Sequence, residues 1–162
     1  MGMYTAFRGK VIIKEEYKDL VELINVGDWE TAIEKYPFTK HYYDIESSTL
    51  LPYSKGRIKR QLEENREIYL EYDPHDWSKD SAYFTDLKGL EWTFITSLKD
   101  YSDEEHDDKS PIETFIDVIL SEVVCKINRL QEAYEGWKYN DTPYLEYDFD
   151  KVVVNTITSK RD

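Results

Sequence analysis

Residues 110–137 have the sequence SPIETFIDVILSEVVCKINRLQEAYEGW, and this stretch decides which fold we predict. It opens with a hydroxyl at Ser110, a proline at the next position and Glu113 three residues after Ser110, which together form a helix-start signal. Behind that signal, apolar residues recur every three or four positions, as on one face of an amphipathic helix. These residues are Ile112, Ile116, Ile119, Val123, Ile127, Leu130, Tyr134 and Trp137. The spacing predicts one long helix of roughly 25 residues, or about 37 Å.

A long amphipathic helix needs a broad apolar partner, and the rest of the sequence predicts an antiparallel sheet for that role. Residues 3–13 alternate apolar and polar side chains, which is typical of a strand with one buried face. Residues 82–98 and residues 144–157 each have the pattern of a β-hairpin, with Lys88-Gly89 as the short loop of the first. We expect the second arm of that first hairpin, residues 90–98, to lie at the centre of the sheet.

Two shorter helices are predicted over residues 14–26 and 28–36, because apolar residues there recur at helical spacing between stop and start signals. Strands that meet in hairpins beside a few helices indicate an α+β fold. We therefore predict a mainly antiparallel sheet of about five to seven strands, with one long helix and two shorter helices packed on it. Residues 3–158 are expected to form a single domain, and residues 159–162 a polar tail.

The composition limits the classes of partner. Thirty-four acidic and 21 basic side chains among 162 residues give a net charge of −13, which opposes direct binding to nucleic acid or to an anionic membrane and favours a basic protein surface. The single cysteine, Cys125, excludes an intrachain disulfide, and we expect its thiol to be buried on the long helix. No long apolar run or secretory leader is visible, which favours the cytoplasm. No phosphate loop or other cofactor motif is recognisable, so no cofactor is expected.

The strongest candidate for an interaction surface is the acidic run that precedes the predicted long helix. A divalent ion could bind such oxygens, but the register and glycine of an EF-hand are missing, so we predict no metal site. A solvated loop is the simplest alternative. Tyrosines are enriched at protein interfaces, and one tyrosine precedes this run while two others follow the end of the predicted helix. The predicted partner-binding residues are Asp103, Glu104, Glu105, Asp107, Asp108, Tyr101, Tyr139 and Tyr144.

These features favour a binding protein over an enzyme. We interpret the chain as a small acidic inhibitor or immunity-type protein, of the sort encoded near toxins or in mobile elements. Such a protein would occlude a basic surface on a partner such as a nucleic-acid enzyme, with its carboxylates in the stronger form imitating a phosphate path. It would act as a monomer or a small homo-oligomer.

Two alternatives come from other functional classes. A small-molecule pocket could lie between the long helix and the sheet, lined by Trp92, Phe94 and Trp137. A metal-dependent hydrolase could use Asp73 and His75, because a carboxylate beside an imidazole suits general acid–base chemistry. Asp-Pro-His-Asp is also an ordinary turn sequence, which makes the hydrolase the weakest interpretation.

Overall fold

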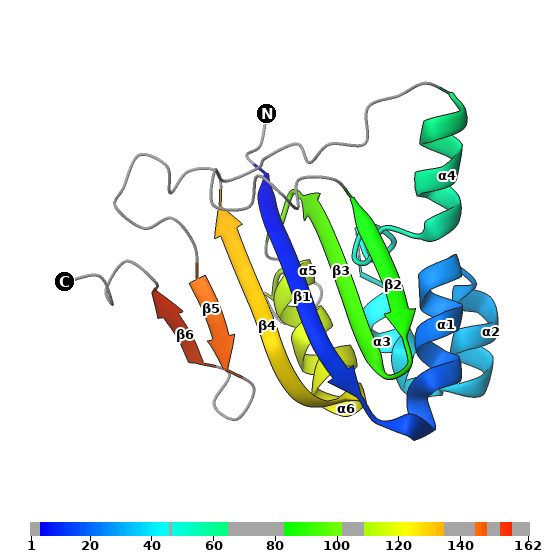
Figure 1. The fold of residues 1–162 in the computed structure, drawn as a ribbon, viewed down its shortest axis with the longest axis horizontal. Coiled ribbons are helices and arrows are strands. Elements are labelled where there is room, and N and C mark those ends of the chain that lie inside the picture. Colours follow the sequence, from blue (N-terminus) through cyan, green and yellow to red (C-terminus); the bar gives the residue numbers. More distant parts are fainter. Residues whose placement is uncertain are drawn as a thin grey trace.

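The protein is built on one antiparallel sheet, seen in a computed structural model that describes residues 4–45, 47–64, 83–101, 109–134, 145–148 and 153–156. Six strands pair in the order β2-β3-β1-β4-β5-β6 (Figure 1). Their bounds are β1 Thr5–Ile13, β2 Phe84–Lys88, β3 Glu91–Leu98, β4 Val124–Tyr134, β5 Leu145–Asp148 and β6 Val153–Thr156. The predicted α+β class with a mainly antiparallel sheet is therefore confirmed.

The described helices are all short. They are η1 Glu15–Tyr17, α1 Lys18–Val26, α2 Trp29–Lys35, η2 Pro37–Thr39, α3 Lys40–Tyr43, α4 Lys55–Glu63, α5 Pro111–Thr114, the π-helical turns η5 Phe115–Leu120, and α6 Ser121–Val123. None of the helices in these ranges is long and apolar enough to cross a membrane.

The helices predicted over residues 14–26 and 28–36 are present as α1 and α2, and their ends follow from local chemistry. Gly27 closes α1 with φ of 84°, a left-handed conformation that glycine adopts without steric cost. The side chain of Asp28 then caps α2 by accepting a hydrogen bond from the backbone N–H of Thr31, which satisfies an otherwise unpaired donor.

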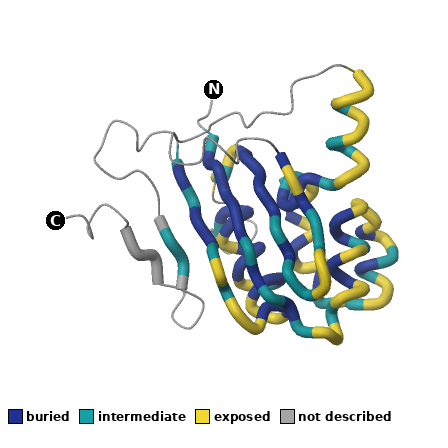
Figure 2. The backbone as a smooth tube through the Cα atoms, viewed as in Figure 1, coloured by how far each residue is buried: buried dark blue, intermediate teal, exposed yellow. Residues whose placement is uncertain are grey.

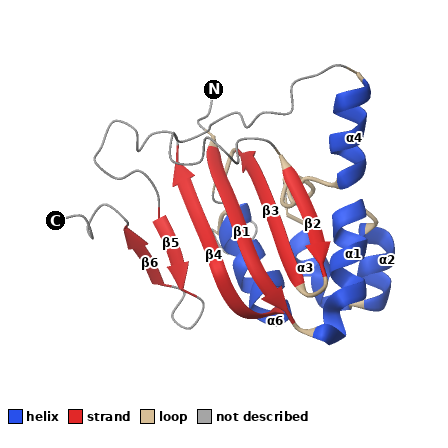
Figure 3. Ribbon diagram, in the orientation of Figure 1, coloured by secondary structure: helices blue, strands red, loops and turns tan. Residues whose placement is uncertain are grey.

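Helices α5 and α6 lie on one side of the sheet, whereas Ile58 of α4 packs against a second buried cluster that includes Ala6, Ile95 and Ala133. Figure 3 shows α5 and α6 behind β1, β3 and β4, with no described helix in front of these strands. Phe115, on η5, packs against the sheet, with its ring centroid 5.6 Å from that of Phe94 and 5.9 Å from that of Trp92. Figure 2 shows the buried residues concentrated along the inner strands and the helix behind them. The main hydrophobic core is therefore the layer between the sheet and the helices.

The prediction of one long helix over residues 110–137 is wrong. The helix begins at Pro111 as predicted but ends at Val123, and the chain continues as strand β4. Along β4 the side chains of Val124, Ile127 and Leu130 are three residues apart, which the sequence analysis read as helical spacing.

Two β-bulges explain this misleading spacing. In the pairing of β1 with β4, Gly9 faces Leu130, Val11 faces Ile127 and Ile13 faces Val124, with shifts of register between them. Each bulge adds one unpaired residue to β4, so two consecutive positions on the core face are three residues apart instead of two. A bulged strand thus produced the same apolar pattern as a helix.

Two further expectations were wrong because residues 124–134 form a strand and not a helix. The arm predicted over residues 90–98 is strand β3, Glu91–Leu98, and it is not at the centre of the sheet, because β1 and β4 occupy the middle of the strand order. Cys125 is exposed on β4 rather than buried on a helix. The predicted polar tail, residues 159–162, lies outside the described residues, and the single-domain boundary at 3–158 stays a prediction.

Candidate interaction site at the acidic end of the sheet

Several chain segments that are distant in sequence reach the same end of the sheet. Thr5 on β1 pairs with Leu98 on one side and with Tyr134 on the other. Strand β5 begins at Leu145, which pairs with Glu132, two residues before the end of β4. The start of β1, the ends of β3 and β4, and the start of β5 therefore lie together.

The start of helix α5 is fastened to this same end. Ser110 and Glu113 form a capping box, in which each side chain accepts a hydrogen bond from the backbone N–H of the other residue. Asp100, just after β3, accepts a further bond from the backbone N–H of Ile112 at 2.8 Å. Because these bonds satisfy the first free donors of the helix, the segment that leaves β3 and the segment that enters α5 are held together.

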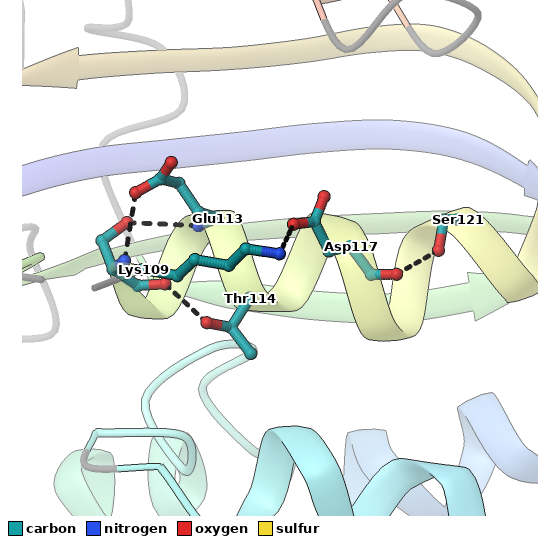
Figure 4. A network of polar contacts seen from close by, with 6 residues as sticks. Lys109, Glu113, Thr114, Asp117 and Ser121 are labelled. Atoms are coloured by element: carbon teal, nitrogen blue, oxygen red, sulfur yellow. Dashed lines mark hydrogen bonds and ion pairs between the residues drawn. The ribbon is translucent and has the colours of Figure 1, made fainter. Parts of the chain in front are cut away.

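Figure 4 shows a second set of polar contacts that continues along this helix. Lys109 forms an ion pair with Asp117 at 2.5 Å, and Thr114 donates a hydrogen bond to the carbonyl of Ser110 at 2.9 Å. The Ser121 hydroxyl bonds the Asp117 carbonyl. These contacts fix Lys109, the residue at which the chain returns from the predicted acidic run.

Glu132 is the least expected residue of this end, because it lies on the side of β4 that faces the helices. It pairs with Phe7 on β1 and is half-buried. The hydroxyl of Tyr147, from β5, donates a hydrogen bond to Glu132 Oε1 at 2.5 Å. A carboxyl group is thus placed against the core of an acidic protein.

Burial controls the protonation of this cluster. Desolvation raises the pKa of Glu132 to about 7, and the charges of Asp100 and Glu113 act in the same direction. Desolvation likewise raises the pKa of Asp100 to about 6, against the opposing effect of its hydrogen bonds from Ile112 and Ser110. Buried carboxyls favour the neutral form because a low-dielectric surrounding penalises charge. Asp100 and Glu132 therefore change from the protonated to the ionised form as the pH rises through about 6 and about 7, respectively.

Most of the predicted partner-binding residues fall outside the described ranges. Asp103, Glu104, Glu105, Asp107 and Asp108 lie between the described residues Tyr101 and Lys109, and Tyr139 and Tyr144 lie between β4 and β5. Tyr101 is described and is 52% exposed. The structure therefore shows where each of these two segments leaves and rejoins the described part of the chain. These points lie at the end of the sheet that is formed by the start of β1, the ends of β3 and β4 and the start of β5, which we call the acidic end.

The residues of the alternative pocket behave as core residues where they are described. Trp92 and Phe94 are fully buried. The Trp92 indole N–H donates to Asn25 Oδ1 at 3.0 Å, and its ring lies 5.1 Å from that of Phe94. Trp137, and the residues Asp73 and His75 of the hydrolase alternative, lie outside the described residues.

The clustering of Asp100, Glu132 and Tyr147 was not predicted from the sequence. A signal for Glu132 was present, because strand alternation from Leu130 places Glu132 on the buried face. Reading β4 as a helix assigned Glu132 to the solvent side instead. Within the described ranges, no group of three potential ligands among His, Cys, Asp and Glu has metal-binding geometry.

Comparisons with known proteins add no relative. No family model, no curated protein and no solved structure matches this chain.

Proposed function

We propose that this protein is a small acidic binding module that uses the acidic end of its sheet to occlude a basic surface on a partner protein. The class that fits best is an inhibitor or immunity-type protein acting in the cytoplasm, with a nucleic-acid-processing enzyme as the partner. Such enzymes carry cationic surfaces for phosphates, and an acidic protein can cover them by charge complementarity.

The observation that supports the proposal is that the described residues flanking the two candidate segments lie at one end of the sheet. The run of residues 102–108 is anchored between Tyr101 and Lys109, and residues 135–144 are anchored between Tyr134 and Leu145. The register of β1 with β3 and β4 puts these anchors at one end of the sheet. The described residues that flank the five carboxylates and the two tyrosines therefore lie at one end of the sheet.

Charge gives the proposal its physical content. A net charge of −13 attracts a cationic partner over several ångströms, and the attraction weakens as salt shortens the screening length to about 8 Å at physiological ionic strength. Exposed tyrosine adds contact area with a polar tip, which suits the centre of an interface. Association is therefore expected to be fast and dependent on salt.

The test is affinity capture followed by a comparison of charge-matched variants. One variant neutralises Asp103, Glu104, Glu105, Asp107 and Asp108 by replacement with Asn or Gln. The matched control neutralises five exposed acids near the opposite end of β1, namely Glu15, Glu16, Asp19, Glu22 and Glu30. Each set removes five negative charges, so both variants change from −13 to −8.

A partner that binds wild type and the control but is lost by the first variant supports the proposed surface. Equal loss from both variants would mean that net charge alone attracts the partner. Binding that is indifferent to salt, or unaffected by the first variant, would contradict the proposal.

A further inference from the structure

Strand β5 is attached to the rest of the sheet by a small contact. Within the described residues, only Gln131 and Glu132 of β4 pair with β5, opposite Glu146 and Leu145. By contrast, β4 pairs with β1 along nearly its whole length. A strand held by so short a ladder depends on its side-chain contacts to stay in place.

Two side-chain contacts reinforce this short ladder, one on each face of the sheet. On the face of the sheet opposite Phe7, the buried Gln131 donates from Nε2 to Glu146 Oε1 at 3.3 Å. On the helix face, the Tyr147 hydroxyl donates to Glu132 at 2.5 Å, and the Tyr147 ring packs edge-on against Phe7 with centroids 6.5 Å apart. Docking of β5 therefore places an aromatic ring and its hydroxyl over the Glu132 carboxyl.

The groups that face Glu132 do not neutralise it. Asp100, from the connection after β3, and Glu113, from α5, both add negative charge. The paired position on β1 is the apolar Phe7, and β5 contributes the neutral phenol of Tyr147. None of these described neighbours is a cation, so an ionised Glu132 covered by β5 has one hydrogen bond and no counter-charge.

We propose that Glu132 is a proton-operated latch for the β5–β6 hairpin. With its carboxyl protonated, Glu132 tolerates burial beneath Tyr147, and the hairpin stays docked on β4. When the carboxylate is ionised, docking of the hairpin keeps its charge away from water and beside the carboxylates of Asp100 and Glu113. Detachment of the hairpin exposes that charge to water again. The device is independent of the partner proposed above.

The direction of the effect follows from linkage. Burial raises the pKa of Glu132 from 4.5 to about 7, although the hydrogen bond from Tyr147 acts in the opposite direction. Because the effect of burial is the larger one, the docked state is inferred to bind the proton more tightly than the open state does. Docking is then strongest below pH 4.5 and weakens as pH rises toward 7. Between these values, one proton changes the docking equilibrium by up to about tenfold per pH unit.

Hydrogen exchange of the full chain tests the latch directly. Protection of the β5 amides, corrected for the intrinsic effect of pH, is measured from pH 5 to pH 8 with the β1 amides as the internal reference for the fold. We expect β5 protection to fall by at least tenfold over this range while β1 protection changes much less. The variant Glu132→Gln should keep β5 protected throughout, because an amide of the same shape carries no charge.

Two variants separate the latch from ordinary structural roles. Glu146→Gln removes a carboxyl on the other face of the same strand and should leave the pH dependence intact. Tyr147→Phe should lower β5 protection at every pH without abolishing its slope, since Glu132 is still enclosed. The proposal is overturned if wild-type β5 protection does not change with pH, or if Glu132→Gln retains the wild-type slope.

Discussion

Gly9 is the residue at which the central strand can accept no side chain. It pairs with Phe94 on β3, and a Cβ atom added at Gly9 would overlap the Phe94 ring. The ring covers the gap that the glycine leaves, as aromatic residues do opposite glycines in sheets. The packing of Phe94 against Phe7 and Phe115 leaves little room for it to move.

Replacing Gly9 with alanine should therefore lower the free energy of unfolding by about 1–3 kcal/mol through overpacking. The measurement is urea denaturation followed by circular dichroism. The matched control is Gly56→Ala in α4, where an added Cβ meets nothing within 4 Å and alanine has the better helix propensity. An equal loss of stability in both variants would contradict the close approach at Gly9.

Asn25 joins α1 to the sheet through a buried polar contact. Its Oδ1 accepts hydrogen bonds from Thr85 Oγ1 at 2.6 Å and from Trp92 Nε1 at 3.0 Å. Asn25→Leu leaves both donors without this acceptor, which should cost about 1–3 kcal/mol. In a double-mutant cycle measured by urea denaturation, Thr85→Val should cost less in the Asn25→Leu background than in wild type. Additive losses would show that the contact is not coupled.

At the scale of elements, helices were predicted correctly where a helix-start signal, a helix-stop signal and the spacing of apolar residues all indicated the same segment. Asp28 as a cap and Gly27 as a stop fixed α1 and α2, and Ser110 with Glu113 fixed the start of α5. The end of that helix could not be read, because the bulges of β4 keep Val124, Ile127 and Leu130 at helical spacing. A bulge is selected by pairing with β1, and that information is not local to the stretch.

The same error explains why the candidate site was found only in part. The acidic run and the tyrosines are visible as composition, so they could be named from the sequence. The described residues that flank these segments lie together because β3 and β4 flank β1, and predicting this required β4 to be a strand. The burial of Glu132 and its contact with Tyr147 required the same correction.

Cys125 distinguishes the bulged strand from the predicted helix. On the predicted helix the thiol was expected to be buried, whereas on β4 it is exposed. The native protein should therefore react with one equivalent of a thiol reagent at close to the rate of the urea-unfolded chain. A lag that disappears only on unfolding would contradict the strand assignment.

For the whole molecule, the two carboxyls with raised pKa values make stability depend on pH. Asp100 shifts from 3.8 to about 6 and Glu132 from 4.5 to about 7, so folding takes up protons. Their stabilising contribution is complete below the unfolded values and is lost as pH rises through 6 and 7. Both side chains are partly exposed, so solvent screening reduces the effect.

We expect unfolding at pH 5 to require more free energy than at pH 8, by on the order of 2 kcal/mol. Urea denaturation across this range measures the difference. The double variant Asp100→Asn, Glu132→Gln should flatten most of the profile, and the exposed pair Glu15→Gln, Glu16→Gln should not. A wild-type protein that is less stable at pH 5 than at pH 8 would contradict the raised pKa values.

The proposed interaction is tested most directly by the dissociation constant of the captured partner for the two charge-matched variants, at about 50 and 300 mM salt. Neutralising the five acids of residues 103–108 should weaken binding at least tenfold at low salt and reduce its dependence on salt. Neutralising Glu15, Glu16, Asp19, Glu22 and Glu30 should change the constant by less than about twofold, because those charges lie far from the contact. Equal dissociation constants for the two variants would contradict the assignment of binding to the acidic end of the sheet.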